Sequence, residues 1–154
     1  MKRFYVLLAM LGVLMAALPG AATAAAPSAT VFVAADASWV ATGVTVDSGD
    51  SLADTARGQA ITGPLSEFPG ARSGPDGQVT ICPDPGGPSL TCNDNGSPYG
   101  ALVAKIGMSG SSFLVGSSFT GVVGAGEVYL AVNDNLGYHF DNKGGFATQL
   151  TVSP

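Results

Sequence analysis

Basic residues are scarce in this chain of 154 residues, which has six Lys and Arg residues against eleven Asp and Glu residues. Two of the six, Lys2 and Arg3, lie in an N-terminal segment that we expect to be removed. Four basic residues would then remain against eleven acidic ones, a net charge of −7. Nucleic acid and anionic membranes are poor partners for such a chain, whereas cations and neutral molecules suit it.

Histidine and cysteine are also rare, with His139 as the single histidine and Cys82 and Cys92 as the two cysteines. We expect the two cysteines to form a disulfide, because only nine residues separate them in a chain with export features. Closing this loop would stabilise the fold by about 2 kcal/mol in the chain-entropy model. The alternative is a zinc site that uses both thiolates and His139, although their spacing matches no zinc pattern.

Sequence motifs of the common enzyme classes are lacking as well. The chain has no nucleophile elbow and no zinc-protease motif. Asp134 and Asp141 could supply the two carboxylates of a glycosidase, but a small domain has little room for a deep cleft. We therefore expect that the protein is not an enzyme.

The segment 1–24 has the features of a secretory signal peptide. Two basic residues precede an uncharged run, 4–18, which a Pro-Gly pair ends, and the small residues 22–24 offer a cleavage site. The apolar run is shorter than the roughly 20 residues that a bilayer-spanning helix needs. These features predict a secreted or periplasmic protein that is not inserted in a membrane.

The rest of the chain, about 130 residues, reads as one all-β domain over 27–154. The β-branched or aromatic runs are ATVFVAA, SWVATGVTV, ALVAKIG, SSFLVG, GEVYLAVN and GFATQLTV. Turn-forming clusters such as DSGD, SGPDG and GSPYG separate them, which favours an antiparallel sandwich or barrel. We expect SGSSFLVGSSF to form two strands that meet at a tight turn. The Pro-, Gly- and Asn-rich stretch 78–99 is expected to be a long surface loop held by the disulfide.

The segment 131–145, AVNDNLGYHFDNKGG, is rich in side-chain oxygens. Its Asn and Asp residues lie within ten positions and are Asn133, Asp134, Asn135, Asp141 and Asn142. Carboxylate and amide oxygens are hard ligands that suit Ca²⁺, and a glycine-containing loop can add backbone carbonyls. The EF-hand pattern is absent. On composition alone, the alternative that these residues only form turns is equally good.

The order of several motifs is more specific than any of them alone. GALVAKIG, SFLVG and GEVYLAVNDNLGYHFDNKGGF follow one another, and TGVTVDSGD, ARGQAITGP and SGPDGQ precede them. This series resembles the PA-IL-like bacterial galactophilic lectins over about residues 39–152, apart from 78–99. The resemblance implies an antiparallel jelly-roll-type β-sandwich with one calcium ion that coordinates two vicinal hydroxyls of a sugar.

The resemblance also implies the residues of the site. Three side chains and two backbone carbonyls would hold the calcium ion, namely Asp134, Asp141 and Asn142, and Thr62 and Tyr138. Asp134, Asn135, Tyr138 and Asp141 would contact the carbohydrate, a terminal galactose-like sugar or a related glycan. Lectins of this type can be tetrameric, so a homo-oligomer is compatible with the resemblance. Two alternatives remain: a calcium-stabilised structural or adhesive domain, and an accessory module of a carbohydrate-active enzyme.

The chain departs from this family at particular positions. A His-Pro-x-Gln segment that contacts the sugar in galactophilic members is absent before the cysteines, which leaves the preferred sugar open. Asp54 replaces an apolar strand residue, which predicts an edge strand or a local change of register. Trp39 is expected to be a core or strand-end anchor. His139 is either a contact of the site or an exposed loop residue, and the Tyr138 ring could crowd the sugar or stack on it.

Overall fold

The computed structural model describes residues 25–63, 72–83 and 91–154. The predicted signal peptide, 1–24, lies outside them and stays a prediction, as does the domain boundary. The elements are β1 (Ser28–Ala34), β2 (Val40–Val46), β3 (Ser51–Ile61), β4 (Arg72–Ser73), β5 (Leu102–Ile106), β6 (Ser112–Leu114), β7 (Ser118–Val122), β8 (Gly126–Val132), the 3-10 helix η1 (His139–Asp141) and β9 (Lys143–Ser153). In the described ranges, no helix has the length and apolar character needed to cross a bilayer.

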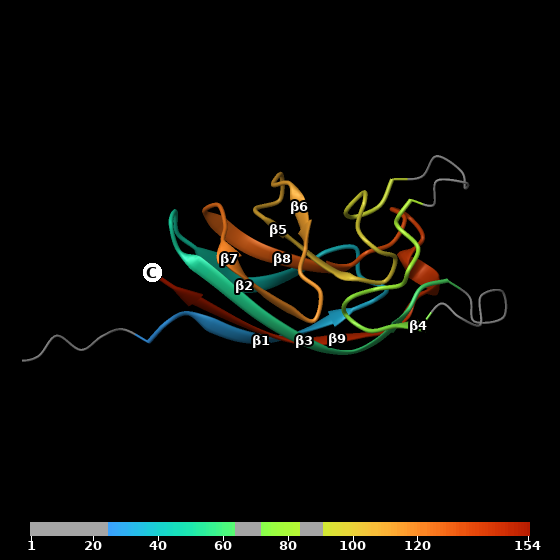
Figure 1. The fold of residues 1–154 in the computed structure, drawn as a ribbon, viewed down its shortest axis with the longest axis horizontal. Coiled ribbons are helices and arrows are strands. Elements are labelled where there is room, and N and C mark those ends of the chain that lie inside the picture. Colours follow the sequence, from blue (N-terminus) through green and yellow to red (C-terminus); the bar gives the residue numbers. More distant parts are fainter. Residues whose placement is uncertain (1–24, 64–71, 84–90) are drawn as a thin grey trace, which may run out of the picture.

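The strands form two antiparallel sheets that pack face to face (Figure 1). One sheet has the order β1-β9-β3, and β7 and the short β4 both pair with β3, one near each of its ends. The other sheet has the order β2-β8-β5-β6. Two sheets of the orders 1-9-3-7 and 2-8-5-6 have the strand arrangement of a jelly roll. The predicted all-β, antiparallel, jelly-roll-type sandwich is therefore confirmed.

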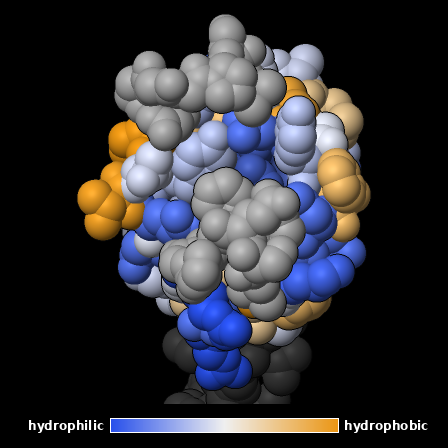
Figure 2. Space-filling view, turned by 90° about the vertical axis from the view of Figure 1, so that its right-hand side faces the viewer, coloured by the Kyte–Doolittle hydropathy of each residue, from blue (hydrophilic) through white to orange (hydrophobic). Residues whose placement is uncertain are grey.

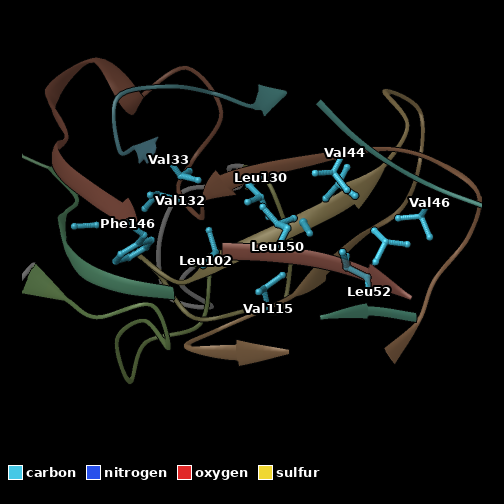
Figure 3. Close-up of a cluster of buried hydrophobic side chains, with 14 of the residues drawn as sticks. Val33, Val44, Val46, Leu52, Leu102, Val115, Leu130, Val132, Phe146 and Leu150 are labelled. Atoms are coloured by element: carbon cyan, nitrogen blue, oxygen red, sulfur yellow. The ribbon is translucent and has the colours of Figure 1, made fainter. Parts of the chain in front are cut away.

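The core lies between the sheets because alternate residues of each strand point inward. In β9, Phe146, Leu150 and Val152 are buried, whereas Gln149 and Thr151 between them are not. Side chains from both sheets meet in this layer (Figure 3). The larger ones are Val33, Val44, Val46, Leu52, Leu102, Val115, Leu130, Val132, Phe146 and Leu150.

Asp54 lies in the middle of a sheet, so the prediction of an edge strand or a changed register was wrong. Its part of β3 pairs with β9 on one side and β7 on the other, where it faces Leu150 and Phe119 in regular register. The side chain is 1% exposed and its carboxylate oxygens lack a well-formed hydrogen bond. Burial raises its pKa to about 6, which the backbone amides of Thr55 and Gln149 offset only in part.

The segment 109–119 was predicted to form two strands that meet at a tight turn; it contributes to two strands, β6 and β7, but they belong to different sheets. β6 pairs with β5, whereas β7 pairs with β3. The connection between them therefore crosses from one sheet to the other. It is fixed where the backbone amides of Val115 and Gly116 both donate to the Leu102 carbonyl, at 2.9 and 3.0 Å.

Trp39 lies directly before β2 and is half-buried. The Nζ atom of Lys105 lies 4.4 Å from the centroid of its ring and donates to the Met108 carbonyl at 3.0 Å. This environment agrees with the expected role of Trp39 as a strand-end anchor.

The two ends of the described chain lie close together. Ser28 at the start of β1 pairs with Thr151 near the end of β9. In Figure 1 this edge is on the left, whereas the segment 133–142 and the end of β3 lie on the right.

Candidate functional site

The segment 133–142 is placed by the register of β3 and β9. Ile61 pairs with Lys143, so the residues that follow β3 lie beside those that precede β9. The Gly63 amide donates to Asn142 Oδ1 at 2.9 Å across this junction. Thr62 is thus brought next to the oxygen-rich segment, although about 80 residues separate them in the chain. This contact was expected from the resemblance, and no local pattern shows it.

Two glycines near the start of β9, Gly144 and Gly145, allow β9 to begin close to its neighbouring strands. Gly144 and Gly145 have φ of 75° and 151°, a region that disfavours other residues. A side chain at Gly144 would collide with the carbonyl of Gln59, and one at Gly145 with that of Val33. The KGG sequence therefore lets β9 start tightly between β3 and β1.

Asp134 and Asn142 form the buried centre of the segment. The Asn142 side-chain amide donates to Asp134 Oδ2 at 2.8 Å and to the Ala35 carbonyl at 3.1 Å. The other Asp134 oxygen, Oδ1, accepts the backbone N–H of Asn135 at 2.7 Å. These contacts fix the orientation of the carboxylate. Asn142 Oδ1 accepts from Gly63 and keeps a second lone pair, since an amide oxygen has two.

Asp141 carries a buried polar atom without a hydrogen-bond partner, the one such atom that the described part of segment 133–142 contains. Its Oδ1 atom is buried and has no hydrogen bond. Burying a carboxylate oxygen is costly unless a donor or a cation compensates it. Against the larger effect of burial, Asp134 and Asp141 each raise the pKa of the His139 imidazole electrostatically. The segment 133–142 thus carries two carboxylates, and one oxygen of Asp141 is still to be satisfied.

His139 is buried and hydrogen-bonded, so it is not an exposed loop residue. Its Nε2 atom lies 2.8 Å from Oδ1 of Asn93, which requires the proton on Nε2 because the amide oxygen only accepts. Burial lowers the pKa of His139, against the opposing effect of Asp134 and Asp141. The Asn93 backbone amide also donates to the Asp134 carbonyl at 3.1 Å. The contacts of Asn93 with His139 and Asp134 thus hold the segment 133–142 in place from the protein interior.

The segment around the disulfide, residues 91–99, packs against the segment 133–142. Cys82 and Cys92 are joined in a disulfide, as predicted, and the described residues contain no free cysteine. Cys92 forms an isolated antiparallel bridge with Asn135, and the Leu136 amide donates to the Thr91 carbonyl at 2.7 Å. The described part of 78–99 is therefore irregular, as expected, but it also contacts the segment 133–142.

Asn133 ties the two segments together and was not predicted to do so. Its side-chain amide donates to three carbonyls, those of Asp94, Ser97 and Pro98, at 3.0 to 3.1 Å. Its Oδ1 atom accepts the Asp94 amide at 2.9 Å. The side chain is completely buried. The composition of segment 131–145 made Asn133 a candidate ligand, but all four hydrogen bonds of its side chain join parts of the fold.

Asn135 and Thr62 also make contacts within the protein. Asn135 Nδ2 donates to the Tyr99 hydroxyl at 2.9 Å. Thr62 is buried, and its hydroxyl accepts a hydrogen bond from Gln78 Nε2 at 3.1 Å. The side chain of Thr62 thus points into the protein, and only its backbone carbonyl remains for the role that the resemblance implies.

Tyr138 and Phe140 lie on the outer side of the segment. Tyr138 is 49% exposed and Phe140 is 74% exposed. Their rings stack on each other, with centroids 6.4 Å apart and planes at 30°. Figure 2 shows this end of the molecule, where hydrophilic residues cover much of the face and hydrophobic ones lie toward its margin.

The donor set suits a hard cation. Across the described ranges, no three His, Cys, Asp or Glu side chains gather, so a cation here would depend on amide and backbone oxygens besides Asp134 and Asp141. Oxygen ligands of mixed carboxylate, amide and carbonyl type are those of Ca²⁺. The buried, unpaired Asp141 oxygen is the observation in favour of such an ion.

Comparison with solved structures finds a similar chain described as "EclA N-terminal domain; PllA-like lectin". It shares 23% sequence identity with a TM-score of 0.61, and the match covers 81% of this chain and 96% of that chain. No protein-family model matches the sequence, and no curated protein does. The predicted likeness to this kind of lectin is confirmed at the level of the fold, which the chain shares with a PllA-like lectin domain over most of its length.

Proposed function

We propose that the protein is a secreted, calcium-dependent lectin. The observation that carries the proposal is the buried Asp141 oxygen without a hydrogen bond, in the same segment as the Asp134 carboxylate that the Asn142 amide holds. The shared fold with a PllA-like lectin domain supports it. The disulfide agrees with export, because such bonds persist in oxidising compartments.

Asp134, Asp141 and Asn142 would hold the calcium ion through side-chain oxygens, and Thr62 and Tyr138 through backbone carbonyls. This shell has five protein residues, whereas Ca²⁺ takes six to eight oxygens. When bound, the ion supplies open positions for two adjacent sugar hydroxyls. The protein contributes by holding the Asp134 carboxylate in a fixed orientation, which the bonds from Asn135 and Asn142 achieve.

Hydrogen bonds from the same hydroxyls to Asp134 and Asp141 would add to the binding energy. A bond between a hydroxyl and a carboxylate is stronger than one between neutral groups. Adjacent hydroxyls in cis orientation, as in galactose, meet this requirement. No bond is made or broken in the sugar, so the proposed function is recognition without catalysis.

Calorimetric titration tests this proposal. Galactose, mannose and fucose are titrated into the protein in calcium and again in chelator, and at least one is expected to bind only in calcium. Asp141→Ala should weaken that binding strongly, because it removes the side-chain oxygens. Asp47→Asn is the matched control, since Asp47 is exposed in the turn after β2, and it should bind like the wild type.

Calcium binding without sugar binding, across these sugars and a broad glycan array, would contradict the lectin. It would leave a calcium-stabilised structural or adhesive domain. Turnover of a glycoside substrate would contradict the absence of catalysis. Sedimentation of the same samples determines whether the protein is a homo-oligomer.

A further inference from the structure

Two exposed aromatic rings beside the candidate site have no role in holding the fold. Tyr138 and Phe140 contact each other through stacked rings, and Phe140 is among the most exposed large hydrophobic residues of the described chain. Covering an exposed phenyl ring with apolar atoms is favourable, because it removes apolar surface from water. The two rings remain largely exposed in the folded protein, so a ligand that covers them would gain this apolar contact.

The backbone holds the rings in their outward position. The Tyr138 amide donates to the Asn135 carbonyl at 3.0 Å, and the Asn142 amide donates to the His139 carbonyl at 3.1 Å. His139, between the two aromatic residues, is buried and bonded to Asn93. His139 points inward, and its two neighbours, Tyr138 before the short helix η1 and Phe140 within it, are exposed to solvent on an anchored backbone.

The rings also adjoin the polar atoms of the proposed site. Phe140 directly precedes Asp141, whose buried oxygen is unpaired, and Tyr138 is four residues from Asp134. Because both rings belong to the short segment that carries the two carboxylates, we expect a ligand of the carboxylates to lie within reach of the rings. Such a ligand needs hydroxyls at one end and an apolar face at the other. A pyranose has both, since its C–H bonds form an apolar face between its hydroxyls.

We propose that Tyr138 and Phe140 form an aromatic platform for the second sugar ring of a glycan, the ring linked to the sugar held at Asp134 and Asp141. This inference rests on the proposed function and adds the class of ligand, an oligosaccharide. A protein partner fits less well, because a stable interface buries about 800 Å² on each partner. Two aromatic side chains bury only about 150 to 250 Å² each.

The test compares a single sugar with a disaccharide in the presence of calcium. Methyl β-galactoside and lactose are titrated into the wild type, Phe140→Ala and Phe140→Tyr. We expect lactose to bind the wild type more tightly than methyl β-galactoside does. Phe140→Ala should lose about fivefold to tenfold in affinity for lactose, within the range of aromatic contacts, and keep its affinity for the monosaccharide within twofold. Phe140→Tyr should behave like the wild type.

Phe32→Ala is the matched control, because Phe32 is another exposed phenylalanine, 60% exposed, on β1. It should leave both affinities unchanged. The calcium-induced rise in melting temperature must be equal in Phe140→Ala and the wild type, which shows that the site loop is intact.

Three results would overturn the platform. Equal losses for both sugars in Phe140→Ala would mean that the ring acts on the first sugar or on the loop. No loss for either would mean that it is not in contact with the glycan. Conversion of an oligomer to a monomer by Phe140→Ala would assign the rings to self-association. Absence of binding by both sugars in the wild type would instead reject galactoside binding by the site itself.

Discussion

Asp54 is a carboxylic acid placed among the apolar side chains of the core, with a pKa raised to about 6 by burial. Between the ordinary pKa of 3.8 and about 6, the folded state binds more protons at this residue than the unfolded state does. The contribution of Asp54 to the free energy of unfolding therefore falls as the pH rises through this window. Above it, the folded chain carries a buried charge with no well-formed hydrogen bond.

Asp54→Asn should remove this pH dependence. At pH 4 the variant and the wild type should be of similar stability, and at pH 7.5 the variant should be more stable by about 2 kcal/mol, because the amide stays neutral. Urea unfolding at pH 4, 5, 6 and 7.5 in chelator measures this. Asp47→Asn, at an exposed turn, should follow the wild type. Parallel pH profiles for Asp54→Asn and the wild type would show that Asp54 keeps an ordinary pKa.

Asp134 is the residue at which the calcium proposal is tested most directly. If calcium binds the native state alone, calcium at 100 times its dissociation constant should stabilise the wild type by about 2.7 kcal/mol. Asp134→Ala should abolish that gain, because it removes the carboxylate that Asn135 and Asn142 orient. Melting curves with calcium and with chelator provide the measurement. A wild-type melting temperature that neither addition changes would leave the segment as a turn only.

At the scale of elements, alternation and turn residues predicted most of the strands, but not all of their partners. The runs ATVFVAA and GFATQLTV correspond to β1 and β9. β3 lacked a clear pattern because Asp54 interrupts its apolar face. The crossing between β6 and β7 could not be predicted, since sequence spacing shows a turn but not the sheet to which each strand adds. The alternation of apolar and polar residues specifies which face of a strand is buried. It does not specify which strand is its partner, which depends on the assembled fold.

The candidate site shows the same limit. Its acidic loop was visible as composition, and Thr62 only through the order of motifs shared with a family. The supporting contacts of Asn93, Asn133 and Tyr99 were not predicted. These residues act through side-chain hydrogen bonds to partners some 35 to 46 positions away, and no local pattern encodes such partners. The sequence offered only the asparagines of 91–99 and 133–142 as a signal, without their partners.

The disulfide segment should matter for binding as well as for stability. Replacing both Cys82 and Cys92 by Ser should lower the free energy of unfolding by about 2 kcal/mol. It should also weaken calcium binding, because the Cys92–Asn135 bridge and the Thr91–Leu136 bond hold the loop. Urea unfolding and calcium titration check the two effects. Unchanged calcium affinity in a folded double variant would show that the disulfide is not needed for calcium binding.

At the scale of the whole molecule, the site is assembled from segments that are far apart in the chain. Contacts to 133–142 come from Ala35, Gly63 and the segment 91–99. The unfolded chain cannot bring these together, so the proposed ligands should bind the native state and report on the integrity of the sandwich. Core stability and site occupancy are therefore linked.

A pair of leucine variants tests this linkage. Leu130→Ala, at a fully buried position of β8, should cost about 2 to 5 kcal/mol. Leu114→Ala, at a half-exposed position of β6, should cost much less. Calcium should raise the melting temperature of both variants as it does in the wild type, because neither residue touches the site. Loss of the calcium response in a folded Leu130→Ala would show that the core positions the ligands directly.

The pairing of Ser28 with Thr151 places the start of β1 and the end of β9 at the same end of the sandwich. This end lies away from the segment 133–142 (Figure 1). A tether attached there would leave the opposite end facing outward. Immobilising the domain through a tag at its C-terminus should therefore present every copy in the same orientation, with the proposed glycan site accessible. Several copies on one surface could then engage several branches of a glycan at once, and the spacing of the anchors would set the avidity.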